Sequence, residues 1–121
     1  MKNQDFGRLL EQRTADFAIR IIKLSISLSR SVETGVIRNQ LTKSATSIGA
    51  NYREANRSRS RRDFINKLKI CESEASETAF WLELINRMKW ADSDVVKALI
   101  EETDELLRIF IAAGKKMNQN K

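Results

Sequence analysis

The sequence predicts an all-α protein, an antiparallel up-down bundle of four helices, and three observations lead to this prediction. Proline is absent from the 121 residues and there are four glycines, so few residues interrupt a helix. Apolar side chains recur every three or four residues along four long segments, which is helical periodicity. The connections between these segments are short, and short connections place consecutive helices antiparallel. We expect a single domain spanning residues 1–121.

The first predicted helix covers residues 14–30. Its apolar residues are spaced by four, three and four positions and are Phe17, Ile21, Leu24 and Leu28. Thr14 is a candidate N-cap, because a hydroxyl can accept a hydrogen bond from the free amides of a first helical turn. A shorter apolar patch precedes it at Phe6, Leu9 and Leu10. This patch is either a leading helical turn or a strap across the bundle.

The second predicted helix covers residues 35–57, with Thr34 as a candidate cap. Its apolar face consists of Ile37, Leu41, Ala45, Ile48, Tyr52 and Ala55. Gly49 stands in the middle of this helix, where glycine costs about 1 kcal/mol relative to alanine. Small residues surround it, so we expect a neighbouring helix to approach closely at this point.

The third predicted helix is the longest, at residues 61–89. Ser60 and Asp63 have the spacing of a capping box, in which the serine side chain accepts from the third helical amide. Its main apolar stripe is Phe64, Leu68, Cys71, Ala75, Leu82 and Ile85.

The fourth predicted helix covers residues 93–113 and is capped by Asp92 or Ser93. Its stripe is Val96, Leu99, Thr103, Leu106, Phe110 and Ala113. Gly114 fits a C-cap, and we expect the tail at residues 114–121 to be frayed.

Helices 3 and 4 each carry a second apolar stripe, which is more apolar surface than one bundle needs. We interpret the excess as an interface between subunits of a homo-oligomer, against the alternative of an over-wide core. The predicted interface residues are Ile70, Trp81, Leu84, Met88, Ile100, Leu107 and Ile111.

The composition argues against most catalytic chemistry. Histidine is absent and Cys71 is the single cysteine, so histidine-dependent triads and thiolate zinc clusters are excluded. The carboxylates of helices 3 and 4 lack the Glu-x-x-His motifs of di-metal bundles. We expect no enzyme activity, no cofactor and no metal. We also expect a reducing, cytoplasmic location and no membrane segment, because one cysteine permits no internal disulfide and no long apolar run is present.

Positive charge is concentrated in the first half of the chain. Residues 1–62 hold 13 Lys/Arg against five Asp/Glu, whereas residues 63–121 hold nine against 11, and the net charge is +6. The densest cluster lies at the junction of helices 2 and 3. The candidate nucleic-acid-binding residues are Arg53, Arg57, Arg59, Arg61 and Arg62, with Lys43 and Lys67 on the adjoining helices.

Three interpretations of this cluster stay open. The planar guanidinium fork of arginine fits phosphate, so the cluster predicts contact with an RNA or DNA backbone without base-specific readout. Alternatively, neighbouring carboxylates such as Glu54, Asp63, Glu72 and Glu74 neutralise it through salt bridges. In a third case the arginines bind an acidic protein surface, which makes the chain a protein-interaction module.

The run QLTKSATSIGANYREA at residues 40–55 resembles a bacterial family of four-helix bundles. This family comprises proteins encoded in intervening sequences of 23S rRNA genes, also labelled S23 ribosomal proteins, and the accessory variability determinants of diversity-generating retroelements. Further similar segments are Phe17-Ala18, Ile21–Leu24, Asp63–Ile65, Lys67-Leu68, Glu74–Thr78 and Trp81-Leu82. The resemblance covers roughly residues 13 to 113.

The resemblance implies an up-down bundle assembled as a homopentameric barrel with a central channel. For the retroelement branch it also implies binding of nucleic acid and of a reverse transcriptase through basic surfaces. The ribosomal label reflects where some of the genes lie and does not imply a component of the ribosome.

Overall fold

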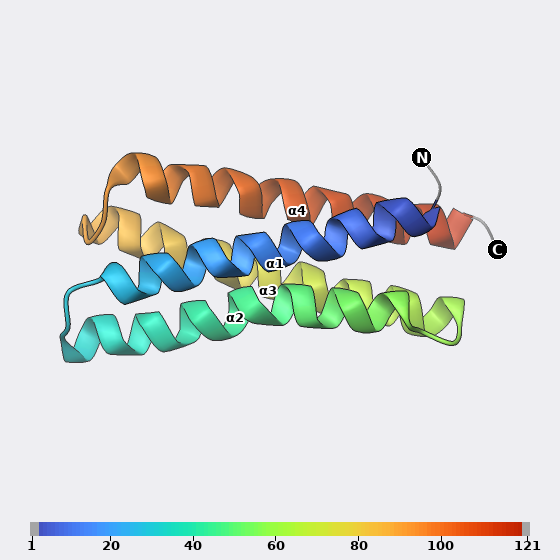
Figure 1. Ribbon diagram of the computed structural model, residues 1–121, viewed down its shortest axis with the longest axis horizontal. Helices are drawn as coiled ribbons and strands as arrows, with labels where there is room; N and C mark the ends of the chain where they lie inside the picture. The colour runs from blue at the N-terminus through green and yellow to red at the C-terminus, as the bar shows by residue number, and fades with distance from the viewer. Residues whose placement is uncertain (1–2, 120–121) are drawn as a thin grey trace.

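The computed structural model describes residues 3–119 and consists of four helices joined by three short connections (Figure 1). The helices are α1 (Asn3–Ser27), α2 (Val32–Asn56), α3 (Arg61–Met88) and α4 (Ser93–Gln119). Each helix runs antiparallel to the one before it, and residues 3–119 contain no strand. The predicted all-α bundle of four helices is therefore confirmed.

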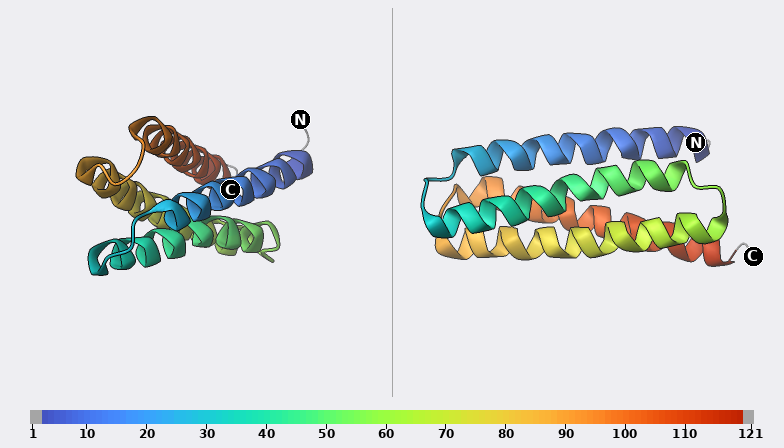
Figure 2. Two further views of the ribbon diagram at one scale, coloured as in Figure 1. Left: turned by 60° about the vertical axis from the view of Figure 1, so that its left-hand side comes forward. Right: turned by 90° about the horizontal axis from the view of Figure 1, so that it is seen from below.

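The helices pack most extensively in chain order. α2 lies along both α1 and α3, and α3 lies along α4, whereas α1 and α4 touch over a shorter length (Figure 2). The up-down course brings the start of α1, the α2–α3 connection and the end of α4 to one end of the molecule (Figure 1). We call this the junction end.

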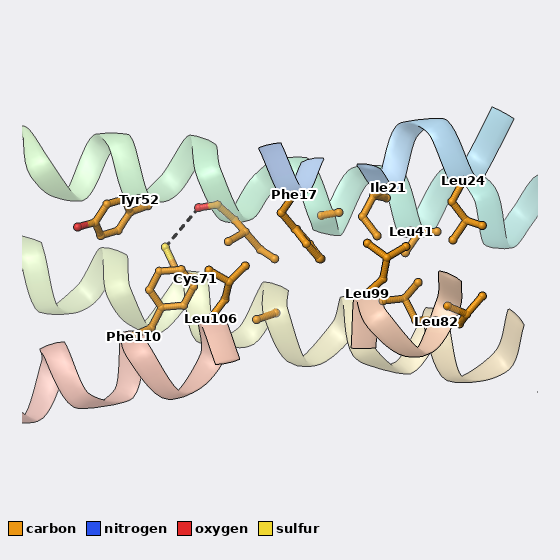
Figure 3. Packing of buried hydrophobic residues seen from close by; sticks show 14 of the residues in the cluster. Phe17, Ile21, Leu24, Leu41, Tyr52, Cys71, Leu82, Leu99, Leu106 and Phe110 are labelled. Carbon is orange, nitrogen blue, oxygen red and sulfur yellow. Dashed lines mark hydrogen bonds between the residues drawn. The ribbon is translucent and has the colours of Figure 1, made fainter. Parts of the chain in front are cut away.

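One continuous core runs along the length of the bundle and takes residues from all four helices (Figure 3). The predicted stripes supply it, because positions three and four apart on a helix share a face. At the junction end the rings of Tyr52 and Phe110 meet with centroids 5.8 Å apart and planes inclined by 39°. Both residues are buried.

α1 begins far before the predicted start at residue 14. Leu10 is buried and continues the apolar spacing of Phe17 toward the N-terminus, so the upstream patch belongs to α1 itself and is not a strap. Thr14 is not an N-cap: it is fully buried in mid-helix, and its Oγ1 donates to the carbonyl of Glu11 at 2.9 Å. α1 ends at Ser27, before the predicted residue 30.

The α1–α2 connection is capped one turn earlier than expected. Ser31 is the N-cap of α2, and Thr34 is its partner at the third helical position, so that each side chain bonds the other residue's backbone amide. This capping box starts α2 at Val32, three residues before the predicted start. The end of α2 at Asn56, with Arg57 as C-cap, lies within one residue of the prediction.

The caps of α3 and α4 are partly as predicted. Ser60 Oγ accepts from the Asp63 amide at 3.0 Å, and Asp92 Oδ1 accepts from the amides of Asp94 and Val95. Gly114 is not a C-cap, because α4 continues through it to Gln119 and no glycine in residues 3–119 has a left-handed backbone. The predicted frayed tail is therefore helical as far as Gln119, and its last two positions lie outside the described residues.

The predicted close approach at Gly49 occurs against α1. A Cβ added to Gly49 would lie 3.1 Å from Thr14 Oγ1 and 3.4 Å from Thr14 Cβ. Those distances are shorter than ordinary contacts, and the Thr14 side chain is itself fully buried. The absent side chain at Gly49 is thus what lets α1 and α2 pack together here.

A Gly49→Val substitution is expected to lower the free energy of unfolding by about 1–3 kcal/mol, the usual cost of overpacking a filled core. Urea unfolding monitored by circular dichroism measures it. Gly35→Val on the same helix is the matched control, because a Cβ there meets nothing within 4 Å. Equal stability of the two variants would contradict the close α1–α2 contact.

Cys71 is a buried thiol at the α2–α3 contact. Its Sγ donates to the Ile48 carbonyl at 3.5 Å (Figure 3). Burial raises the pKa of Cys71 from 9.0 to about 12. Because the folded thiol holds its proton more tightly than the unfolded one, the free energy of unfolding should fall as pH rises from 9 toward 12.

The same burial predicts slow alkylation of Cys71. At about pH 8 the thiolate fraction is about a thousandfold lower in the folded chain than in the unfolded one, and the thiolate is the reactive form. Iodoacetamide labelling followed by mass spectrometry should therefore be at least that much slower in buffer than in denaturing urea. Comparable rates in the two solutions would show that Cys71 is accessible in the native fold.

A bidentate ion pair joins α1 to α4. Arg13 Nε and Nη2 each lie 2.7 Å from a carboxylate oxygen of Glu102, and Glu105 lies 3.1 Å from Nη2. The hydrogen bond to Glu102 is the main reason that the pKa of Arg13 is raised. Part of the acidic surface of α4 therefore neutralises a cation of α1, which helps to join these two helices.

Candidate nucleic-acid interface

The arginine cluster occupies the junction end, from the last turns of α2 to the first turn of α3. α2 ends at Asn56, and the backbone amide of its C-cap, Arg57, donates to the carbonyl of Glu54 at 3.1 Å. α3 begins after the Ser60 cap, and its positive dipole end points toward the connection. The connection is short, so the arginines of both helices gather within a small region of the surface.

Two of the arginines face α1. Arg53 Nε lies 3.7 Å and Arg57 Nη1 lies 4.0 Å from Glu11 Oε1. The side-chain Nδ2 of Asn56 donates to the other carboxylate oxygen, Glu11 Oε2, at 2.8 Å. Arg57 Nη1 also donates to the Arg53 carbonyl at 3.0 Å. Arg53 and Arg57 thus do lie near a carboxylate, but it is Glu11 of α1 and not one of the four neighbouring carboxylates that the sequence suggested, and both arginine side chains are more than half exposed.

Lys67 is also engaged inside the molecule. Its Nζ lies 2.9 Å from Glu54 Oε1, and this pair joins α2 to α3 across the junction. Lys67 is close to the arginines, as predicted, but its charge is largely balanced by Glu54.

Arg59, Arg61 and Arg62 differ from their neighbours. All three are exposed, and within residues 3–119 none of them forms an ion pair. They follow one another through the connection and into the first turn of α3. Three exposed guanidinium groups without an ion pair in the described residues therefore lie within four successive positions of the chain, where they can bind an external anion.

Lys43 is not part of this cluster. It lies ten residues before Arg53 on the same helix, a separation of about 15 Å along the axis. Its charge acts instead on Glu74 of α3. The pKa of Glu74 is raised by burial and by repulsion from Glu77, and Lys43 opposes that shift.

A hollow of about 550 Å³ opens in the surface beside the connection. Its lining combines cations, uncharged polar groups, two carboxylates and one apolar side chain. The lining residues are Glu54, Arg57, Ser58, Arg59, Asp63, Asn66, Lys67 and Ile70. The junction end thus offers a concave feature as well as a charged surface.

Two further lysines lie at the junction end. Lys115 and Lys116 are exposed and belong to the last turns of α4, which reach this end of the bundle (Figure 1). Sequence reasoning left them in a frayed tail. Nothing local in the sequence places them near the arginines, because the placement follows from the direction of α4.

The seven predicted interface residues divide into two groups. Ile70, Met88 and Ile111 are exposed by 41%, 58% and 37%. Trp81, Ile100 and Leu107 are partly buried and pack against the core of their own chain, and Leu84 is half-buried. Much of the second apolar stripe thus packs inside its own chain. The subunit interface stays a prediction for the exposed residues Ile70, Met88 and Ile111.

α1 carries an apolar stripe that sequence reasoning missed. Ile19, Ile22 and Ile26 are exposed by 50%, 37% and 76%. Their spacing of three and four residues puts them on one face, and at 3.6 residues per turn that face points away from the core. The signal was present in the sequence but stands beside the stronger core stripe. It widens the apolar surface available for contact with another copy.

Residues 3–119 show neither a metal-binding cluster nor a membrane-spanning helix. No group of three or more cysteine, aspartate or glutamate side chains is arranged there to hold a metal ion. Each described helix is too polar or too short in its apolar run to traverse a bilayer.

Comparison with known proteins adds a family and a structural neighbour. The model of the family described as 23S rRNA-intervening sequence protein matches residues 10–112. A crystal structure of a protein with unknown function, from the S23 ribosomal protein family of Bacteroides thetaiotaomicron, superposes with a TM-score of 0.83 at 36% sequence identity. The match covers 90% of this chain and 97% of that chain. No curated protein matches the chain.

Proposed function

Because the chain belongs to the family of 23S rRNA-intervening sequence proteins, we propose that it is a non-enzymatic helical bundle that binds nucleic-acid backbone. The contact is electrostatic and lies at the junction end. Arg59, Arg61 and Arg62 make the principal phosphate contacts, and Arg53 and Arg57 contribute after exchanging their long contacts to Glu11 for a phosphate oxygen.

The proposal rests on a difference between two groups of basic residues in the cluster, those with a carboxylate partner and those without one among residues 3–119. Arg53, Arg57 and Lys67 have carboxylate partners in the fold, whereas Arg59, Arg61 and Arg62 have none within the described part of the chain. A purely structural cluster would balance its charges internally. Guanidinium groups left exposed together are typical of phosphate binding.

The proposal includes assembly of several copies, the pentamer that the family resemblance implies. Exposed apolar side chains on α1 and α3 support it, since single scattered residues are ordinary but aligned ones mark interaction surfaces. They include Ile19 and Ile26 on α1 and Met88 on α3, whereas Ile70 lines the hollow beside the α2–α3 connection. Repeating a modest basic surface around a ring multiplies its affinity for one strand, because later contacts form at high effective concentration.

A salt titration tests the proposal. Fluorescently labelled RNA and DNA strands of about 12 nucleotides, within the usual ~4–16-nucleotide range of single-strand sites, are titrated with protein at increasing salt. We expect binding at low salt that weakens linearly in a plot of log K against log salt concentration. The absence of binding at low salt would refute the proposal.

The alternative function is a protein-interaction module whose arginines meet an acidic protein surface. In its narrower form this makes the chain a retroelement accessory protein with a reverse transcriptase as partner. An affinity purification performed with and without nuclease separates the two cases. A partner protein that remains bound after nuclease treatment favours the module, and one that is lost favours nucleic acid as the direct ligand.

A further inference from the structure

We propose, resting on the nucleic-acid function above, that the hollow beside the α2–α3 connection holds one unpaired base and prefers cytosine or adenine, which carry an amino group where uracil and guanine carry a carbonyl. The ligand class is therefore single-stranded nucleic acid with exposed cytosine or adenine. The proposal depends on what lines the hollow and on which of its charges are already balanced.

The size and position of the hollow suit a single nucleotide. Its volume of about 550 Å³ lies within the range of ~300–1,000 Å³ typical of small-ligand sites. Arg59 lines it, and the exposed Arg61 and Arg62 follow two and three residues later in the chain. A strand whose phosphates follow these arginines would bring the attached bases to the opening.

The carboxylates decide which part of the nucleotide enters. Glu54 and Asp63 both line the hollow, and a phosphate placed between them would meet two like charges. A base carries no charge, and its amino group donates hydrogen bonds that a carboxylate accepts. The arrangement therefore favours phosphate on the arginines outside and a base inside.

Asp63 is the carboxylate that is available. Glu54 is occupied by Lys67 at 2.9 Å, whereas the Asp63 side chain is exposed and forms no ion pair with any residue from 3 to 119. The cap at the start of α3 uses the Asp63 backbone amide and leaves both carboxylate oxygens unused. A carboxylate oxygen accepts hydrogen bonds and has none to donate.

Two other lining residues complete the site. The side-chain amide of Asn66 has an NH2 group that donates and a carbonyl oxygen that accepts, so it can bond to the Watson–Crick edge of a base. Ile70 is 41% exposed and offers an apolar surface for the face of the ring. A base held in this way must be unstacked and unpaired, because only loops and single strands present their edges freely.

Cytosine and uracil provide the sharpest comparison. They have the same size, but cytosine presents an amino donor where uracil presents a carbonyl acceptor. The oxygens of Asp63 attract the first and repel the second. An oligocytidine of about 12 nucleotides should bind about three- to tenfold more tightly than the oligouridine of equal length, and more tightly than a duplex of the same strand length.

The test measures both affinities by fluorescence anisotropy over a series of salt concentrations for three proteins. These are the unmodified chain, Asp63→Asn and the control Asp104→Asn. Asp104 is an exposed residue of α4 without an ion pair among the described residues. Both substitutions remove one negative charge and should strengthen binding to oligouridine. The asparagine at position 63 alone should bring the cytidine-to-uridine affinity ratio close to one.

The outcomes separate this inference from the function on which it rests. Salt-sensitive binding with equal affinity for the two strands, or a ratio unchanged in Asp63→Asn, overturns the base site and leaves backbone binding standing. A duplex bound at least as tightly as the single strands also overturns the base site. No binding of any strand at low salt overturns both proposals.

Discussion

Replacing Arg59, Arg61 and Arg62 together with alanine is expected to lower the affinity for single-stranded RNA about a hundredfold at about 0.1 M salt, since each lost phosphate contact removes a counterion-release term of ~0.7 in the log–log slope. The slope itself should become shallower by about two for the same reason. These residues have no partner in residues 3–119, so their removal exposes no unpaired carboxylate there. The melting temperature should therefore hardly change.

A matched triple variant controls for net charge. Lys23, Arg30 and Lys97 are exposed cations without ion pairs in the described part of the chain. Arg30 lies in the α1–α2 connection and Lys97 near the start of α4, and both of these segments are at the end of the bundle opposite the junction end (Figure 1). Alanine at all three removes the same charge but should lower affinity much less. If both triples weaken binding equally, the protein binds through its overall charge and the junction end is not the site.

Phe110→Ala is expected to lower the free energy of unfolding by about 3–5 kcal/mol, the usual cost of removing a buried aromatic ring. Phe110 is completely buried in α4 and packs against Tyr52 of α2, so the cavity would open between two helices that both reach the junction end. A loss of this size is a large part of the ~5–15 kcal/mol that stabilises a typical domain. Urea unfolding gives the value directly.

Phe80→Ala is the control for the loss of an aromatic side chain. Phe80 is 50% exposed, and its principal aromatic contact is an edge-to-face pair with Trp81, with ring centroids 5.0 Å apart. We expect this change to cost less than about 1.5 kcal/mol, the upper value for such a pair. A Phe110→Ala loss no larger than that of Phe80→Ala would show that the core is not packed as described here.

The secondary structure could be predicted wherever the signal is local. Helical spacing identified the core faces of all four helices, because burial of one face depends on residues three and four positions apart. Ser60 was recognised as a cap from its own neighbours, and the structure confirms the bond to the Asp63 amide. The absence of proline and the four apolar stripes were sufficient for the fold class.

The predicted helix boundaries were wrong where a residue type that often caps a helix lies in its interior instead. Thr14 has the hydroxyl of a cap, but its position against Gly49 makes it a packing residue, and a sequence cannot show which helix lies opposite. Gly114 has the backbone freedom of a C-cap, yet the helix passes through it. In both cases the local preference is worth about 1 kcal/mol, which packing and helix continuation readily exceed.

The candidate site, like the helix boundaries, could be predicted from the sequence only in part. The sequence by itself determined that arginines crowd the α2–α3 junction, because their clustering is a matter of chain order. Only the tertiary structure decided which of these arginines lie near a carboxylate, since Glu11 reaches Arg53 and Arg57 from α1. It also decided that lysines of α4 lie at the same end of the bundle. Ion pairing depends on distances of a few ångströms between residues far apart in the chain, and those distances exist only once the helices have packed.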